Sequence, residues 1–244
     1  MIRVMTYNVG HYNMGYSTTQ GFPPEIQGEK VSQFKQLMMQ FRPDLIGIQE
    51  ESRYLDQAKT EPASSGLYKP AYPFRSGYDA CTIRSMYGVE DGSYQKIQFS
   101  NGQNFRRGIF RVNGKRVLFI SAHPISKTGN NEARKVQYTE LFQHAKQSGC
   151  DYSIITGDFN TTDQADKNNL KALCEKNGYE MAIGGYLPWV NTFIGRTESQ
   201  RKHSFDNVLV SPGMKIRTTR VLKDWYERLY SDHVPVLCDV EVMA

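Results

Sequence analysis

The chain has few cysteines, and none of them is spaced as in a metal site or a disulfide scaffold. Only four occur in 244 residues, without a Cys-x-x-Cys pair: Cys81, Cys150, Cys174 and Cys238. Cysteine zinc sites and small disulfide-stapled domains need closely grouped cysteines. The spacing therefore excludes both classes and predicts buried free thiols, with a single disulfide bridge left open.

Long apolar runs are also missing. No stretch approaches the roughly 20 apolar residues that cross a bilayer, and no amphipathic or exposed apolar segment indicates stable membrane association. The segment Met1–Asn8 enters a strand pattern directly, without the charged and then apolar order of a signal peptide. We therefore expect a cytoplasmic protein if Met1 is the native start, and a secreted one stays open if a leader was removed.

A strong excess of one charge is absent as well. The chain has 30 Lys and Arg against 25 Asp and Glu, a formal net charge of +5. This mildly basic balance suits a phosphate-bearing substrate but lacks the concentrated charge of a dedicated nucleic-acid arm. The basic stretches at 106–107 and 201–203 are interpreted as solvated loop faces. Three histidines are predicted to lie at the surface: His11, His144 and His203.

What the chain does contain is a series of short apolar strands separated by few helices. No repeat, low-complexity tract or linker interrupts it, so residues 1–244 are predicted to form a single domain. Three strands at 80–84, 94–99 and 108–112 are expected to form an antiparallel meander, continued through the hairpin turn at 113–114. The pattern favours two mixed sheets packed together with helices outside. Further strands are predicted at 2–8, 44–50, 115–122, 204–211, 215–222 and 234–242 and around 153–157, and helices at 31–41, 132–146 and 166–176.

Polar residues stand where these strands end. The first strand, helix and second strand form a β-α-β unit, which predicts parallel neighbours with Asn8 and Glu50 at the same edge. In the stretch Ser153–Thr161, Asp158 and Asn160 are two apart, so in an extended chain both face one side. An Asx-type turn is the structural alternative for this pair. The full set of strand-end residues is Asn8, Glu50, His123, Asp158, Asn160, Asp206, Asp232 and His233.

The residue types in this set indicate a hard metal ion. Carboxylate and amide oxygens suit Mg²⁺ or Mn²⁺. Zinc is disfavoured, because the set holds only two histidines and no cysteine. Taken singly, most of these residues would be ordinary caps of strand ends. Their number argues for convergence on one cleft.

Six motifs follow one another in a distinctive order and spacing. They are Tyr7-Asn8, Gln49-Glu50, His123, Gly157-Asp158-Phe159-Asn160, Phe205-Asp206-Asn207 and Ser231-Asp232-His233-Val234-Pro235. Together they resemble the endonuclease/exonuclease/phosphatase superfamily, which includes pancreatic-type deoxyribonucleases, neutral sphingomyelinases and inositol polyphosphate 5-phosphatases. The resemblance covers essentially the whole chain and implies a four-layer α/β sandwich and metal-dependent cleavage of a phosphate ester. Arg134-x-x-Gln137 and Thr192-Phe193 also look like family features.

The resemblance implies a metal site and names its ligands. Glu50 would be the principal ligand of Mg²⁺, with Mn²⁺ as the alternative ion. Asn8 would lie beside it, and Asp232 would contribute. The number of ions, one or two, is left open.

The resemblance also implies roles for five catalytic residues. Asp158 would orient or deprotonate the attacking water. Asn160 and His123 would hold the phosphate and stabilise the charge that grows on its oxygens. His233, held by Asp206, would stabilise the same charge or serve as acid or base. Which histidine acts as the acid is left open.

Two departures from the family pattern bear on the substrate. Repair-type members carry a tyrosine where this chain has His123, so the chain resembles the deoxyribonuclease, sphingomyelinase, 5-phosphatase and deadenylase branches. Deoxyribonucleases pair that histidine with a glutamate, and only Asp79 is a weak candidate here. Asn207 replaces the usual tyrosine, which predicts different packing behind Asp206.

Three functions are compatible with these residues. The leading hypothesis is Mg²⁺-dependent hydrolysis of a phosphodiester, with nucleic acid as one candidate substrate. The alternative is a phosphatase or phosphodiesterase for a small-molecule, inositol or lipid phosphate. A catalytically silent binding module is the rival of another class, and retention of every motif residue argues against it. The sequence sets neither the substrate, nor protein partners, nor the oligomeric state.

Overall fold

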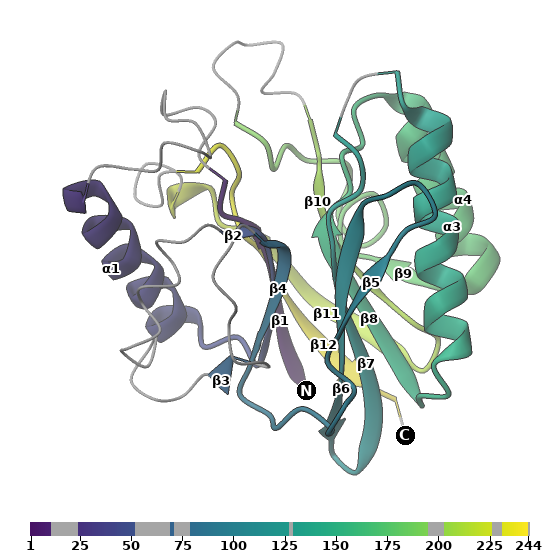
Figure 1. Ribbon diagram of the computed structural model, residues 1–244, viewed down its shortest axis with the longest axis horizontal. Helices are drawn as coiled ribbons and strands as arrows, with labels where there is room; N and C mark the ends of the chain where they lie inside the picture. Colours follow the sequence, from purple (N-terminus) through teal and green to yellow (C-terminus); the bar gives the residue numbers. More distant parts are fainter. Residues whose placement is uncertain are drawn as a thin grey trace.

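The computed structural model describes residues 1–10, 24–51, 69–70, 79–126, 129–194, 203–225 and 231–243. In this part of the chain two six-stranded sheets pack face to face, with helices on their outer faces (Figure 1). The order of the first sheet is β11 (Met214–Val221), β12 (Val236–Val242), β1 (Ile2–Asn8), β2 (Leu45–Glu51), β4 (Asp79–Ser85), β3 (Lys69–Pro70). The order of the second is β5 (Gln95–Gln98), β6 (Asn104–Val112), β7 (Lys115–Ala122), β8 (Tyr152–Asp158), β10 (Asp206–Val210), β9 (Glu180–Met181).

The helices form the two outer layers. Helix α1 (Pro24–Phe41) packs on the first sheet, where its Phe34 and Leu37 join Ile46 of β2 in one apolar cluster. Helices α3 (Asn131–Gln147) and α4 (Gln164–Asn177) cover the second sheet. A 3-10 turn, η3 (Lys223–Trp225), follows β11. The predicted arrangement of two mixed sheets between helices, a four-layer α/β sandwich, is confirmed.

The first β-α-β unit is as the sequence predicts. Strands β1 and β2 are parallel, with Asn8 opposite Gln49. Helix α1 ends at Phe41, just before Pro43, which cannot continue a helix. The unit therefore brings the ends of both strands to one edge of the sheet.

The predicted antiparallel meander is wrong in one strand. Strands β5, β6 and β7 do form one, and the turn at Asn113 (φ 52°) and Gly114 (φ 79°) has the left-handed backbone of a tight hairpin. Strand β4, however, pairs with β2 in the other sheet, with Cys81 opposite Gln49. Sheet membership depends on pairing with residues remote in sequence, which the local alternation of β4 does not encode.

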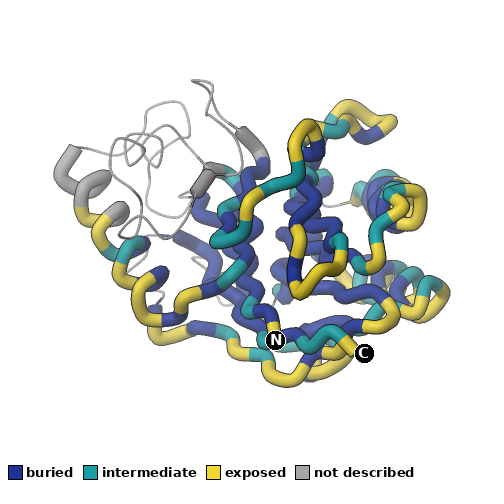
Figure 2. The backbone as a smooth tube through the Cα atoms, turned by 90° about the horizontal axis from the view of Figure 1, so that it is seen from below, coloured by how far each residue is buried: buried dark blue, intermediate teal, exposed yellow. Residues whose placement is uncertain are grey.

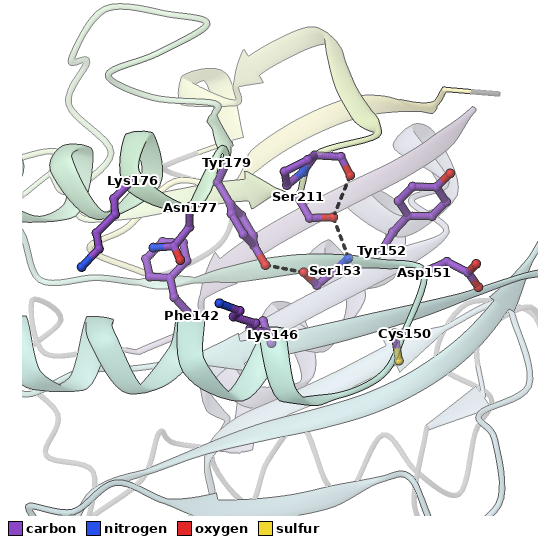
Figure 3. A pocket seen from close by; sticks show the side chains of 12 residues that line it. Phe142, Lys146, Cys150, Asp151, Tyr152, Ser153, Lys176, Asn177, Tyr179 and Ser211 are labelled. Carbon is purple, nitrogen blue, oxygen red and sulfur yellow. Dashed lines mark hydrogen bonds between the residues drawn. The ribbon is translucent and has the colours of Figure 1, made fainter.

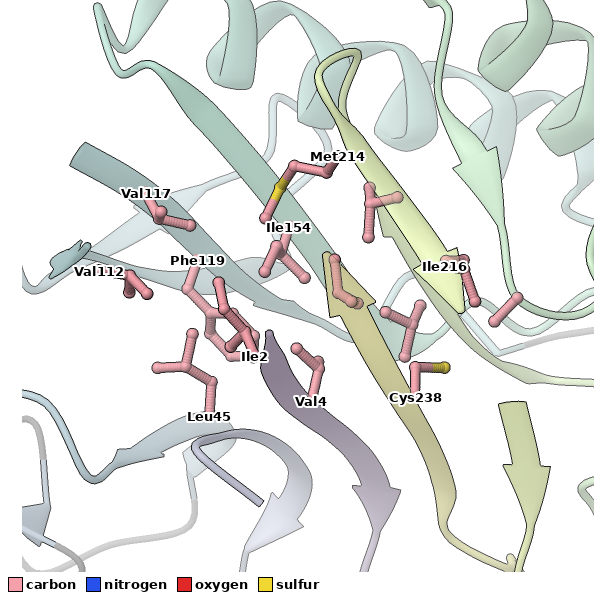
Figure 4. Packing of buried hydrophobic residues seen from close by; sticks show 14 of the residues in the cluster. Ile2, Val4, Leu45, Val112, Val117, Phe119, Ile154, Met214, Ile216 and Cys238 are labelled. Atoms are coloured by element: carbon pink, nitrogen blue, oxygen red, sulfur yellow. The ribbon is translucent and has the colours of Figure 1, made fainter. Parts of the chain in front are cut away.

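The main core lies between the sheets. Figure 4 shows Val4 of β1 and Ile216 of β11 on one side, facing Phe119 of β7 and Ile154 of β8 on the other. Buried strands occupy the middle of the molecule, whereas exposed residues follow the outer helices and loops (Figure 2). The sheets are therefore held together by apolar packing below the edge at which the polar strand ends gather.

The four cysteines are free thiols, as predicted. Cys81, Cys174 and Cys238 are buried, and burial raises the pKa of the Cys238 thiol to about 12. Cys150, after α3, is only partly buried. Because the thiolate is the reactive form, we expect the native protein to react rapidly with Ellman's reagent at Cys150 alone, and at all four after unfolding in guanidinium. Rapid reaction of the native protein in which Cys150 is replaced by serine would contradict this expectation.

Within the described ranges, no helix is long and apolar enough to cross a bilayer.

A pocket of about 440 Å³ opens between the ends of α3 and α4, lined in part by Ser153, Tyr179 and Lys146 (Figure 3). It lies at the start of β8, one strand length of about 20 Å from Asp158. The pocket therefore belongs to the opposite edge of the sheet from the predicted site residues.

Candidate active site

The polar strand ends of both sheets meet at one edge of the sandwich. Asn8 ends β1 and Asp158 ends β8, and the Asn8 amide donates to Asp158 Oδ2 at 2.9 Å across the two sheets. The same amide nitrogen lies 3.2 Å from Glu50 Oε1, at the end of β2. His123 follows β7, and its Nε2 lies 3.5 Å from Asp158 Oδ2 and 3.7 Å from Glu50 Oε1. Asp158 therefore contacts residues from both sheets.

The backbone around Asp158 is both a turn and part of the site. A side chain at Gly157 would overlap the carbonyl oxygen of Ala122 on the neighbouring strand, so only glycine permits this close approach. Asp158 Oδ1 accepts from the backbone N–H of Asn160 at 2.9 Å, which is the bond of an Asx-type turn. Asn160 has φ +50°, and its amide donates to Pro124 O at 2.9 Å. The Asx-type turn is therefore present, while Oδ2 of the same carboxylate faces Asn8, His123 and His233.

A second pair, His233 with Asp206, faces the same carboxylate. His233 Nδ1 lies 2.8 Å from Asp206 Oδ2, and its Nε2 lies 3.6 Å from Asp158 Oδ2. Both residues are buried. The rings of Phe193 and Phe205 pack on the imidazole, with centroids 5.0 and 6.0 Å away. These contacts fix the plane of the ring and point Nε2 toward Asp158.

The charge state of this pair follows from its surroundings. Burial by itself lowers the pKa of His233, but the carboxylates of Asp206 and Asp158 outweigh it and raise the pKa to about 10. Burial raises the pKa of Asp206, and the His233 cation partly offsets that rise. The imidazole is therefore a cation at neutral pH. Asp206 Oδ1 is buried and has no hydrogen-bond partner among the described residues.

Asp232 completes the group of acids. It is buried beside His233, with Oδ1 3.9 Å from His233 Nε2. Burial raises its pKa, His233 opposes the rise, and the charges of Glu50 and Asp158 add to it. Asp232 therefore lies in the electrostatic field of the other carboxylates.

The donor set fits a hard divalent cation. Four carboxylates and two amides gather at this edge, and the ligand atoms of Asp158, Asp206 and His233 lie within 4.8 Å of one another. A side chain at Gly10 would overlap Glu50 and lie 2.9 Å from Asn8 Oδ1, so glycine keeps the space beside these oxygens open. One imidazolium cannot neutralise this many acids, which favours an added divalent cation. All eight predicted site residues lie in this one cluster.

Some expectations about neighbouring residues need correction. Arg106 and Arg107 lie in strand β6 rather than in a loop, and Arg107 Nη1 is 3.0 Å from His144 Nε2. His144 is half-buried rather than a surface residue, and burial lowers its pKa. His203 is also half-buried and stacks on Phe205 at 5.0 Å between centroids.

Other expectations fall on residues outside the described ranges: His11, Arg201 and Lys202. The side chain of Asp79 is also outside the description, so its pairing with His123 stays a prediction. The different packing predicted behind Asp206 stays a prediction, but the contacts of Asn207 are described. Its amide exchanges two hydrogen bonds with the backbone of Ile183, at 3.0 and 2.8 Å.

The sequence profile of the Endonuclease/Exonuclease/phosphatase family matches residues 5–233. The chain belongs to this family. It is therefore a phosphoesterase of the hydrolase class, and its fold is that of the family's solved structures. No curated protein sequence matches the chain.

Solved structures of family members share the fold at low identity. Humanized D. rerio TDP2 is 16% identical with a TM-score of 0.72, and the match covers 98% of each chain. A family member from Bacteroides vulgatus is 18% identical, also with a TM-score of 0.72, over 99% of this chain and 98% of that one. The mannosyl-6-phosphatase Bt3783 of Bacteroides thetaiotaomicron is 20% identical with a TM-score of 0.65, over 99% and 100% of the two chains. These likenesses concern the fold of the family and not the substrate.

Proposed function

We propose that this phosphoesterase is a divalent-metal-dependent phosphodiesterase that acts on nucleic-acid-type diesters. One observation carries the proposal. Asp158 Oδ2 lies 2.9 Å from the Asn8 amide, 3.5 Å from His123 Nε2 and 3.6 Å from His233 Nε2. A carboxylate with three possible donors around it can orient a water molecule against a phosphorus atom held by the same donors.

The metal would be held by Glu50, Asn8 and Asp232, with Mg²⁺ as the first candidate and Mn²⁺ as the second. When bound, such an ion polarises the phosphate oxygens. The gathering of acids around Asp232, whose pKa is raised by burial, supports this assignment. Glu50 supplies the most accessible of these carboxylates, with 19% of its side chain exposed.

The remaining residues would each take one role in cleaving the phosphate ester. Asp158 orients the attacking water and accepts its proton. His123 and Asn160 contact the phosphate oxygens from the side of β7. His233 stabilises the developing negative charge and protonates the leaving oxygen, a role that fits a cation with a pKa of about 10. Asp206 holds Nδ1 and so directs Nε2 to the phosphate.

Two observations favour a diester with a planar group over a monoester. Phe193, partly exposed, packs against His233 at the rim of the site and offers a stacking surface for a base or an aromatic leaving group. D. rerio TDP2 has been solved in complex with a single-strand DNA product, and that structure matches the fold of this chain with a TM-score of 0.72. The mannosyl-6-phosphatase of the same fold makes a sugar phosphate the alternative substrate to test.

A substrate panel tests the proposal. Metal-stripped protein is assayed with Mg²⁺, with Mn²⁺ and with EDTA on plasmid DNA, a single-stranded oligonucleotide, RNA, a bis-aryl phosphodiester, inositol phosphates, sugar phosphates and sphingomyelin. We expect cleavage of the diesters that requires the metal. Cleavage of monoesters alone would replace the proposal with the phosphatase reading, and no cleavage of any ester would leave the binding-module hypothesis.

Metal binding should also be visible without any substrate. We expect Mg²⁺ or Mn²⁺ to raise the Tm of the stripped protein, because the ion binds the folded cluster and screens its carboxylates. At 100 times Kd the gain corresponds to about 2.7 kcal/mol. Glu50→Gln should abolish the shift, whereas Glu140→Gln, a helix-surface acid, should keep it. An equal shift in both variants would rule out Glu50 as a ligand.

A further inference from the structure

One buried charged pair takes no part in the chemistry above. Arg134, in the first turn of α3, and Asp166, in the first turn of α4, both have side chains that are 0% exposed. Two parallel bonds join them, from Nε to Oδ1 at 3.0 Å and from Nη2 to Oδ2 at 2.7 Å. Burying two charges costs hydration that their attraction often fails to recover, so such a pair is weak evidence for stability. The other contacts of the pair lead to the catalytic edge.

The first of these contacts reaches the loop that follows His123. Arg134 Nη1 donates to Ile125 O at 3.2 Å, two residues beyond the histidine. Gln137, one turn further along α3, accepts from Ile125 N at 2.8 Å. Helix α3 therefore holds Ile125 by both its carbonyl and its N–H group, and this fixes the path of the backbone that leaves His123.

The second contact reaches the loop that follows Asn160. Arg134 Nη2 donates to Thr162 Oγ1 at 2.9 Å, and Asp166 Oδ2 accepts from Thr162 N at 3.1 Å and from Thr162 Oγ1 at 2.9 Å. Asn160 itself has φ +50°, a left-handed conformation that asparagine adopts more readily than most residues and that rigid surroundings keep in place. The Arg134–Asp166 pair supplies such surroundings two residues downstream.

The two loops are also tied directly to each other. Asn160 Nδ2 donates to Pro124 O at 2.9 Å, and Pro124 is the residue between His123 and Ile125. We call four residues the Arg134 network: Arg134, Gln137, Thr162 and Asp166. This network bonds to both loops from the helices, and the Asn160–Pro124 bond joins the two loops to each other.

We propose that Arg134 is a positioning residue for phosphate-ester cleavage. Its guanidinium, paired with Asp166, sets the two loops so that His123 and Asn160 face Asp158. This inference rests on the function proposed above. Because an error of about 1 Å in the placement of reacting groups can cost about 100-fold in rate, a support that touches no substrate can still govern kcat. Five rigid N–H donors let one arginine serve Asp166, Ile125 and Thr162 together, which a lysine cannot do.

The test compares two arginine-to-lysine substitutions. Arg134→Lys keeps the positive charge but removes the planar guanidinium that bonds to Asp166, Ile125 and Thr162. We expect kcat to fall about 10- to 100-fold, with KM changed by less than about threefold. The control is Arg116→Lys at the far end of β7, where Arg116 makes a similar two-bond contact with Glu90 at 3.1 and 2.9 Å. We expect kcat of the control to equal that of the wild type. Equal kcat values in both variants would overturn the proposal.

A second variant covers the case in which Arg134→Lys does not fold. Thr162→Val has the same shape but removes the hydroxyl that Arg134 and Asp166 share, and we expect a fall in kcat of about tenfold with the native circular dichroism spectrum retained. A Thr162→Val variant that loses thermal stability while its kcat, measured well below the Tm, stays at the wild-type value would show a merely structural role and reject the inference.

A readout independent of turnover separates this inference from the proposed function. The ring ¹⁵N shifts of His123, followed by NMR at a fixed pH, should change in Arg134→Lys and in Thr162→Val but not in Arg116→Lys. If the wild-type protein cleaves no ester, the proposed function fails, and these shifts alone decide whether Arg134 positions the His123 loop. Unchanged His123 shifts in both variants would reject it.

Discussion

Asp158→Asn is expected to lower kcat about 10⁴-fold while leaving the protein folded. The asparagine has the same shape, so the turn bond from the N–H of Asn160 and a contact with Asn8 can persist. What is lost is the negative charge that accepts a proton from water, a contribution of about 10²–10⁴, together with the electrostatic pairing with two histidines 3.5 and 3.6 Å away. Single-turnover kinetics with saturating Mg²⁺ measure the loss directly.

Stability should move little in this variant. Removing one of four crowded carboxylates relieves repulsion, which offsets the weaker hydrogen bonds, so the free energy of unfolding should stay within about 1 kcal/mol of the wild type. Asp151→Asn, at the opposite end of the same strand and 41% exposed, is the matched control and should keep full activity. A kcat within tenfold of the wild type in Asp158→Asn would remove Asp158 from the chemistry.

His233→Ala is expected to impair both activity and folding. The loss of a charge-stabilising cation lowers kcat by about 10³-fold. The substitution also leaves the buried carboxylate of Asp206 without its partner at 2.8 Å, and a broken buried pair costs about 3–5 kcal/mol. Urea unfolding at pH 6.5 in EDTA measures the free energy of unfolding, and steady-state kinetics with Mg²⁺ measure the activity.

A double variant separates the two effects. In His233→Ala combined with Asp206→Asn no unpaired charge remains, so most of the lost stability should return while the activity does not. If the double variant is no more stable than His233→Ala, the buried ion pair is not the cause of the instability.

The stability deficit of His233→Ala should depend on pH in a defined direction. The pKa of His233 is raised to about 10 in the folded protein, against about 6.5 in an unfolded chain. The proton on the ring therefore stabilises the fold fully below pH ~6.5, and this contribution is lost as the pH rises toward 10. The difference in free energy of unfolding between wild type and variant, both free of metal, should be smaller at pH 9.5 than at pH 6.5. A constant difference would contradict the raised pKa.

Much of the site could be predicted because its residues follow apolar strands. The β-α-β unit places Asn8 beside Glu50, and the Asx-type turn considered for Asp158 and Asn160 is present, whereas the extended alternation ends at Asp158 because Asn160 has φ +50°. These are local rules. The partnership of His233 with Asp206 came from the resemblance to the family, and the structure places the two atoms 2.8 Å apart. Nothing in the spacing of these two residues alone would have paired them.

The features that were missed depend on contacts between remote segments. Strand β4 belongs to the first sheet because it pairs with β2, and its own alternation fits either sheet. The sequence marks Arg134 and Gln137 as a family feature, but the role proposed for Arg134 depends on Asp166, which lies 32 residues away on another helix. The burial of His203 depends in the same way on its stacking against Phe205. A polar residue in an amphipathic helix carries no local sign that it faces inward.

The pairing of β1 with β12, described by Ile2 opposite Val240, has a consequence for how the protein is made. The first sheet takes its strands from both ends of the chain, whereas the second is built from the middle. During synthesis the strands of the second sheet are all made before β12, so β1 lacks one of its two neighbours until β12 has left the ribosome. Contacts of such high sequence separation fold slowly. Because His233 lies in the loop before β12, the charge proposed for it joins the site only after every strand of the second sheet has been made.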